Sequence, residues 1–268
     1  MKLVLHLVGC VFAAALLGGC TKNSATGFQG YVEGEYVYVA APLGGALANL
    51  AVARGDQVKK GQLLFELECQ SEAAALTQAE KNLAQANASL TLAESIFQRR
   101  QELRAAPSGV VSAEELDQAR SQRDADIAQV AAQQAALAKA RWAFNQKQQF
   151  APADAPVHDT LYRQGEFVAA GNPVVALLPP ENLKVRFFVP QEILPQIKVG
   201  QTVSIHCDGA AKDLSATINY ISTQAEYTPP VIYSRETRAE MVFMIEARFS
   251  PADATSVRPG QPADVRLN

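Results

Sequence analysis

The sequence contains one short pattern twice, and a long segment almost free of glycine and proline separates the two copies. RGDQVKKGQLLFEL at residues 54–67 and RQGEFVAAGNPVVAL at residues 163–177 align at a constant offset of about 110 residues, pairing Gly55 with Gly165 and Gly61 with Gly171. Each copy alternates short apolar runs with glycine-containing turns, which is typical of β-strands joined by tight turns. One copy alone would leave its apolar face in water. We therefore expect the two copies to pack together as halves of one small β-sandwich.

The segment between the copies predicts an antiparallel helical hairpin. In the first arm, a large apolar residue recurs every seven positions, and an alanine follows three residues after each of the first three. This is a coiled-coil seam whose small residues let a partner helix approach closely. The first arm contributes Leu76, Ala79, Leu83, Ala86, Leu90, Ala93 and Phe97; the second keeps the same register at Leu116, Val130, Leu137 and Phe144, interrupted by Arg123.

Residues 107–109, Pro-Ser-Gly, break the first helix, and Ser112 to Glu115 restart the second with the spacing of a capping box. Each arm has about 37 residues, so at about 1.5 Å per residue the hairpin extends for about 55 Å. A hairpin that leaves and re-enters one compact domain in this way is suited to act as a rigid lever or spacer. The alternative is a solvated stalk that docks to nothing.

After residues 179–180, a Pro-Pro pair, further strand patterns predict a small antiparallel β-barrel. The segment Gly30–Ala40 adds a strand or leads into the sandwich. The fold class is therefore mainly β with a coiled-coil hairpin: a lipoyl-like sandwich, split by the hairpin and followed by an antiparallel barrel. The barrel strands are expected at Leu183–Pro190, Val199–Cys207, Ser215–Ile221, Met241–Ala247 and Ala263–Leu267.

The first twenty residues have the composition of a secretory signal, because Lys2 precedes an apolar run too short for a confident membrane span. Residues 17–20, Leu-Gly-Gly-Cys, resemble the bacterial lipobox, which implies lipidation of Cys20 and firm anchoring by its acyl chains. An ordinary cleaved signal with an incidental cysteine is the alternative. Thr21 stands where aspartate often marks inner-membrane retention. The sequence therefore does not decide which membrane holds the lipid anchor, although the inner membrane is favoured.

Composition and motifs exclude several classes of function. A length of 268 residues with 48% hydrophobic residues allows two or three domains, and the net charge of −3 argues against a nucleic-acid binder. We find no catalytic set, phosphate loop or metal-ligand spacing, and expect no enzyme activity, cofactor or metal. His158 and His206 stand alone. Cys69 and Cys207 are expected to be separate thiols, although the oxidising compartment permits a disulfide.

The predicted organisation divides the chain into six parts. They are a signal peptide (1–19), an anchor linker (20–29), the first sandwich half with a leading strand (30–68), the hairpin (69–149), the second half (150–179) and the barrel (180–268).

The two halves resemble a biotinyl/lipoyl domain, whose carrier function needs a modifiable lysine between the halves. No lysine occurs there between Lys60 and Lys81, and residues 68–71 read Glu-Cys-Gln-Ser. We therefore expect a structural domain. A carrier modified at Lys59 or Lys60 in the preceding turn is the alternative.

The order of lipobox, split lipoyl domain, inserted hairpin and terminal barrel, ending in RPGQPADVRL, resembles the HlyD-type membrane fusion proteins, over about residues 30–267. The resemblance implies a periplasmic adaptor that works as a homo-oligomeric ring between an inner-membrane transporter and an outer-membrane channel, for efflux or secretion. INYIS at residues 218–222 and YTPPVIYSRE at residues 227–236 look most like adaptors of ABC-type exporters. The absence of an obvious further membrane-proximal domain also favours an ABC partner.

In this family the hairpin tip contacts the outer-membrane channel through an arginine, a leucine four residues later and a serine after the turn. Arg99, Leu103 and Ser112 match this pattern, although eight residues separate Leu103 from Ser112 where six are expected. Ser112 is also explained by helix capping alone. Besides the carrier, two functions remain as alternatives to an ABC adaptor: an adaptor of a proton-driven pump, and a lipoprotein spacer that binds no transporter.

Overall fold

A computed structural model describes residues 27–107, 110–208, 212–227 and 241–267. The described residues form two units: those within 35–179 form one, and residues 27–34 join those within 180–267 in the other. The predicted lipidation site Cys20 lies outside the described residues, as does nearly all of the segment at residues 227–236.

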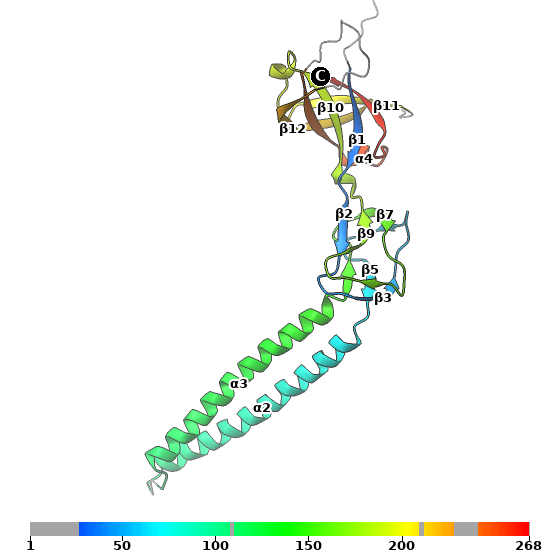
Figure 1. Cartoon of the computed structure of the whole chain (residues 1–268). Coiled ribbons are helices and arrows are strands. Elements are labelled where there is room, and N and C mark those ends of the chain that lie inside the picture. The colour runs from blue at the N-terminus through cyan, green and yellow to red at the C-terminus, as the bar shows by residue number, and fades with distance from the viewer. Residues whose placement is uncertain (1–26, 108–109, 209–211, 228–240, 268) are drawn as a thin grey trace, which may run out of the picture. The chain divides into compact units, whose positions relative to one another are not determined.

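The unit of residues 35–179 contains a β-sandwich built from both copies of the repeat (Figure 1). Each of its sheets takes strands from both copies, so neither half is complete alone. Fully buried side chains such as Leu47, Phe65, Val157 and Val168 fill the space between the sheets. One sheet has the order β2 (Val37–Ala40), β9 (Pro173–Leu177), β7 (Ala155–Thr160), β4 (Gln57–Val58), and the other β6 (Gln148–Phe150), β5 (Leu63–Leu67), β3 (Gly45–Leu50), β8 (Phe167–Val168).

A pseudo-twofold relation connects the halves down to individual hydrogen bonds. The amide of Leu47 donates to the carbonyl of Glu166, and 110 residues further on the amide of Val157 donates to the carbonyl of Asp56, both at 2.8 Å. The amides of Gly61 and Gly171 make a second matched pair, donating to the carbonyls of Ala151 and Ala41. The sequence repeat is therefore a repeat of backbone pairing, and the predicted split sandwich is confirmed.

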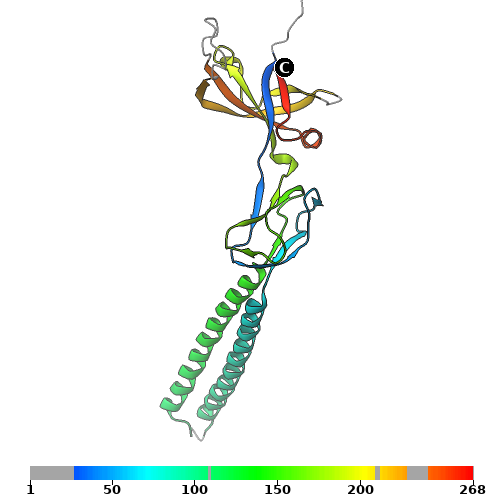
Figure 2. The ribbon, with the colours of Figure 1, turned by 45° about the vertical axis from the view of Figure 1, so that its right-hand side comes forward.

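Between the halves, α2 (Gln70–Ala105) and α3 (Ala113–Asn145) run side by side as the predicted hairpin (Figures 1 and 2). The 36 residues of α2 give a length of about 54 Å at about 1.5 Å per residue. The seam differs from expectation in one respect: its alanines are buried, whereas its leucines are only half-buried. Each helix packs against a single neighbouring helix, which buries only the side chains closest to the line of contact between them. Leu76, Leu83 and Leu90 are the half-buried leucines, and Ala79, Ala86 and Ala93 the buried alanines.

The hairpin ends earlier than the predicted boundary between residues 149 and 150. Helix α3 stops at Asn145, and β6 begins at Gln148 and pairs with β5. Residues 145–149 are polar, like the exposed surface of the helix that precedes them. The sequence periodicity alone therefore did not show where α3 ends and β6 begins.

The second unit is a closed antiparallel barrel with the strand order β1 (Phe28–Gly34), β10 (Leu183–Pro190), β13 (Met241–Phe249), β12 (Leu214–Tyr227), β11 (Thr202–Cys207), β14 (Pro262–Leu267). Alternate side chains, including Val185, Phe187, Val203, Ile245 and Val265, are fully buried. Two short 3-10 helices, η2 (Pro180–Asn182) and η3 (Leu194–Gln196), and the short helix α4 (Pro251–Ala254) connect the strands.

The leading strand assigned to the first sandwich half is divided between the two units. Strand β1 closes the barrel by pairing with β10 and β14, whereas β2 pairs with β9 in the sandwich. Gly30 allows β1 and β10 to approach, because a Cβ there would collide with the carbonyl oxygen of Arg186 and the side chain of Phe187. Without β1, strands β10 and β14 would expose unpaired edges.

The two cysteines in the described residues are free thiols, as predicted. Cys69 precedes α2, and Cys207 lies buried in β11, where burial raises the pKa of its thiol and the nearby carboxylates of Asp208 and Asp264 raise it further. None of the helices in the described ranges combines the length and the apolar composition of a membrane span.

Candidate partner-binding site at the hairpin tip

The three predicted tip residues lie at the turn between the helices. Arg99 and Leu103 are on the final two turns of α2, four residues apart, which places them on one face of the helix. Ser112 is the N-cap of α3. Arg99 and Ser112 are exposed, and 42% of Leu103 is exposed, so a partner can reach all three.

The start of α3 is fixed by the predicted capping box. The Ser112 hydroxyl accepts from the amide of Glu115 at 3.2 Å, and Glu115 Oε2 accepts from the amide of Ser112 at 2.9 Å. Glu115 Oε2 also accepts from the Ser112 hydroxyl at 2.9 Å. The two hydrogen bonds to this carboxylate, from the Ser112 amide first and then from its hydroxyl, lower the pKa of Glu115. The serine therefore has a complete structural role without any partner.

Two arginines that the sequence interpretation did not single out connect the arms at the tip. Arg100 Nη1 donates to the carbonyl of Glu115 at 2.7 Å, and Arg104 Nη1 donates to the carbonyl of Val111 at 3.5 Å. Both continue the seam register beyond Phe97, at three and seven residues. That spacing was a signal that could have identified them. They hold the turn, which leaves Arg99 and Leu103 facing outward.

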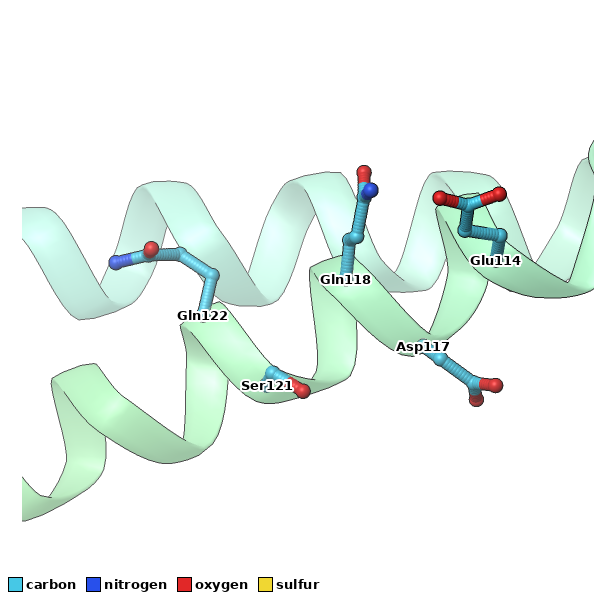
Figure 3. A pocket seen from close by; sticks show the side chains of 5 residues that line it. All are labelled: Glu114, Asp117, Gln118, Ser121 and Gln122. Carbon is cyan, nitrogen blue, oxygen red and sulfur yellow. The ribbon is translucent and has the colours of Figure 1, made fainter.

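A shallow polar groove of about 810 Å³ follows the first turns of α3. Figure 3 shows Glu114, Gln118 and Gln122 projecting to one side of the helix, and Asp117 and Ser121 to the other. Because the side chains diverge, they do not converge on a ligand. Among the described residues, no group of three or more His, Cys, Asp or Glu side chains could hold a metal ion.

Comparisons with known proteins agree with this architecture. A family model described as "RND MFP, alpha-helical hairpin domain" matches residues 75–147. A relative from Salmonella typhi, the UPF0194 membrane protein YbhG, is 26% identical over 324 aligned positions that cover 99% of this chain and 97% of the relative.

Solved structures share the fold at lower identity. The membrane fusion protein Spr0693 from Streptococcus pneumoniae R6 superposes with a TM-score of 0.66 at 20% identity, covering 90% of this chain and 98% of that one. MacA from Actinobacillus actinomycetemcomitans gives a TM-score of 0.63 at 17% identity, covering 90% and 78%. The matched hairpin model and the shared fold agree with the predicted resemblance to membrane fusion proteins: the chain is similar to them in its hairpin sequence and has the fold of Spr0693 and MacA.

Proposed function

We propose that the chain is a non-enzymatic periplasmic adaptor, anchored through lipidated Cys20, that joins an inner-membrane exporter to an outer-membrane channel. The observation that carries the proposal is the hairpin itself. A small sandwich carries two helices of 36 and 33 residues whose tip presents Arg99 and Leu103 to solvent. A long arm with an exposed apolar residue at its end is suited to bind a partner far from the domain that carries it.

Tip docking is tested by placing a photo-crosslinking amino acid at Leu103 in the full chain in cells. We expect a cross-link to an outer-membrane channel. The matched control carries the same amino acid at Lys139, which is exposed on α3 towards the sandwich end of the hairpin. Equal cross-linking at both positions, or none at Leu103, would contradict docking at the tip.

The inner-membrane partner is proposed to be an ABC-type exporter, on the resemblance of the segments at residues 218–222 and 227–236. A second candidate, an adaptor of a proton-driven pump, is favoured by the RND description of the matching hairpin model. Affinity purification after membrane cross-linking separates the two. An ABC adaptor recovers a permease with an ATPase, a pump adaptor recovers a large multi-span protein without one, and a simple spacer recovers neither.

Two further parts of the proposal have direct tests. Mass spectrometry of the mature chain would show acyl groups on Cys20, and a lipoyl or biotinyl adduct at Lys59 or Lys60 would instead indicate a carrier. Assembly into a homo-oligomeric ring is tested by the mass of the full chain in detergent.

A further inference from the structure

The base of the hairpin contains a buried lysine that interrupts the symmetry of the sandwich. Lys147 is 4% exposed and follows the end of α3. At the pseudo-equivalent position, 110 residues earlier, the other half has Val37, whose part-buried side chain packs on the core. The backbone role is the same in both halves, since Val37 is paired with Leu177 and the Lys147 carbonyl accepts from the amide of Leu67 at 2.8 Å. The difference therefore lies in the side chain.

The Lys147 ammonium connects three separate parts of this unit. It donates to the carbonyl of Gly44, just before β3, at 2.8 Å. It also forms an ion pair of 3.0 Å with Glu72 in the first turn of α2. Because Lys147 lies two residues beyond the end of α3, one side chain joins the beginning of α2, the end of α3 and the sandwich.

The surroundings fit this lysine closely. A Cβ on Gly45 would lie 3.2 Å from the Lys147 ammonium nitrogen, so a larger residue at position 45 would crowd the charge. The pseudo-equivalent residue in the other half is Ala155, and there the position equivalent to Lys147 is Val37. The pKa of Glu72 is lowered: burial raises it, but hydrogen bonds from Ser71 and Lys147 and the lysine charge outweigh that effect.

We infer that Lys147 is a positioning residue that fixes the angle of the hairpin on the sandwich through Glu72 and Gly44. Only two residues of backbone separate β5 from α2, and two separate α3 from β6. On an arm of about 54 Å, a tilt of about 5° moves the tip by about 5 Å, which exceeds the tolerance of a specific contact. A charge pair with a buried lysine is suited to this role, because displacing Glu72 leaves the Lys147 ammonium without its counter-charge in a poorly solvated site.

The test measures the hairpin angle directly on the purified full chain in detergent. Spin-labelled unnatural amino acids at Gln57 on the sandwich and Gln98 on α2, both exposed, leave the native cysteines untouched. We expect Lys147→Met to at least double the width of the distance distribution between the labels, with the circular dichroism of a folded chain retained. Lys139→Met, an exposed lysine on α3, is the matched control and should leave the width unchanged.

A folded Lys147→Met variant with the wild-type width would overturn the inference. If Lys147→Met does not fold, Glu72→Gln tests the inference instead, because it removes the ion pair and keeps the hydrogen bond from Lys147 to Gly44. We expect this variant to give a distance distribution of intermediate width. A width equal to that of the wild type would reject the proposal. The consequence for export rests on the proposed adaptor function. The distance measurement needs no partner, so it can succeed or fail independently of the cross-linking test.

Discussion

The guanidinium carbon of Arg123 lies 4.3 Å from the centre of the Phe97 ring. Arg123 occupies the position at which the heptad pattern of the second arm is interrupted, and Phe97 is the last large apolar residue of the first arm's seam. A cation over an aromatic face is attractive by about 0.5–1 kcal/mol at exposed sites. At this position of the seam, Arg123 therefore contacts the first helix through a cation–π interaction in place of an apolar contact.

Phe97→Ala is expected to destabilise the chain by about 3 kcal/mol, because it removes a buried ring and its contact with Arg123. Arg123→Leu should change stability by less than about 1 kcal/mol, since leucine restores the heptad pattern as it removes the cation. Urea unfolding followed at 222 nm measures both. In a cycle that pairs Phe97→Ala with Arg123→Ala, which makes no new seam contact, the double variant should show a coupling of about 0.5–1 kcal/mol, and strict additivity would mean that the two side chains do not interact.

Ser112→Ala is expected to cost about 1 kcal/mol of helix stability, because the amide of Glu115 loses its acceptor. Ser112→Asp keeps an acceptor at the N-cap and should retain most of that stability. Thermal unfolding measures the change in stability caused by each substitution at the cap, and cross-linking from Leu103 measures whether the tip still contacts its partner. If Ser112→Asp folds like the wild type but loses the cross-link, the serine also contacts the partner. If it keeps the cross-link, Ser112 acts as a cap alone.

The architecture could be predicted because its signals are periodic. The spacing from Gly55 to Gly165 revealed the split sandwich, and the recurrence of Leu83 and Leu90 revealed the hairpin. The membership of β1 in the barrel could not be predicted, because a run of alternating residues does not specify which sheet edge it will pair with. The role of Lys147 was hidden for a similar reason, since its partners Gly44 and Glu72 are 103 and 75 residues away in sequence.

The pseudo-twofold relation predicts that replacing equivalent glycines in the two halves lowers the stability of the chain by equal amounts. Gly55 and Gly165 have φ values of 93° and 90°, and a Cβ at either position would meet nothing within 4 Å. Replacement by alanine is therefore penalised by backbone conformation alone, by about 1–2 kcal/mol. Gly55→Ala and Gly165→Ala should lower the urea midpoint by similar amounts, and asparagine at either position should cost less. A large difference between the two alanine variants would show that the symmetry does not extend to energetics.

Glu246 in the barrel accepts from Lys184 at 2.8 Å and from Arg186 at 2.9 Å, and 11% of its side chain is exposed. Burial raises its pKa, but the hydrogen bonds and charges of these two residues lower it more, so the net pKa lies below the ordinary value of 4.5. A carboxylate with a depressed pKa in the folded state stabilises the fold fully above its unfolded pKa. That contribution is lost as the pH falls below about 4.5 and through the folded-state pKa.

Glu246→Gln is therefore expected to destabilise the barrel at pH 7 by about 3 kcal/mol, because it leaves two partly buried cations with less compensation. The difference from the wild type should shrink as the pH is lowered from 5 to 3, where the wild-type carboxylate takes up its proton. Urea unfolding at several pH values measures this difference. Glu226→Gln, which alters an exposed carboxylate on β12, serves as the control and should change little at any pH. A gap between Glu246→Gln and the wild type that stays constant with pH would show that the ion pairs do not account for the loss.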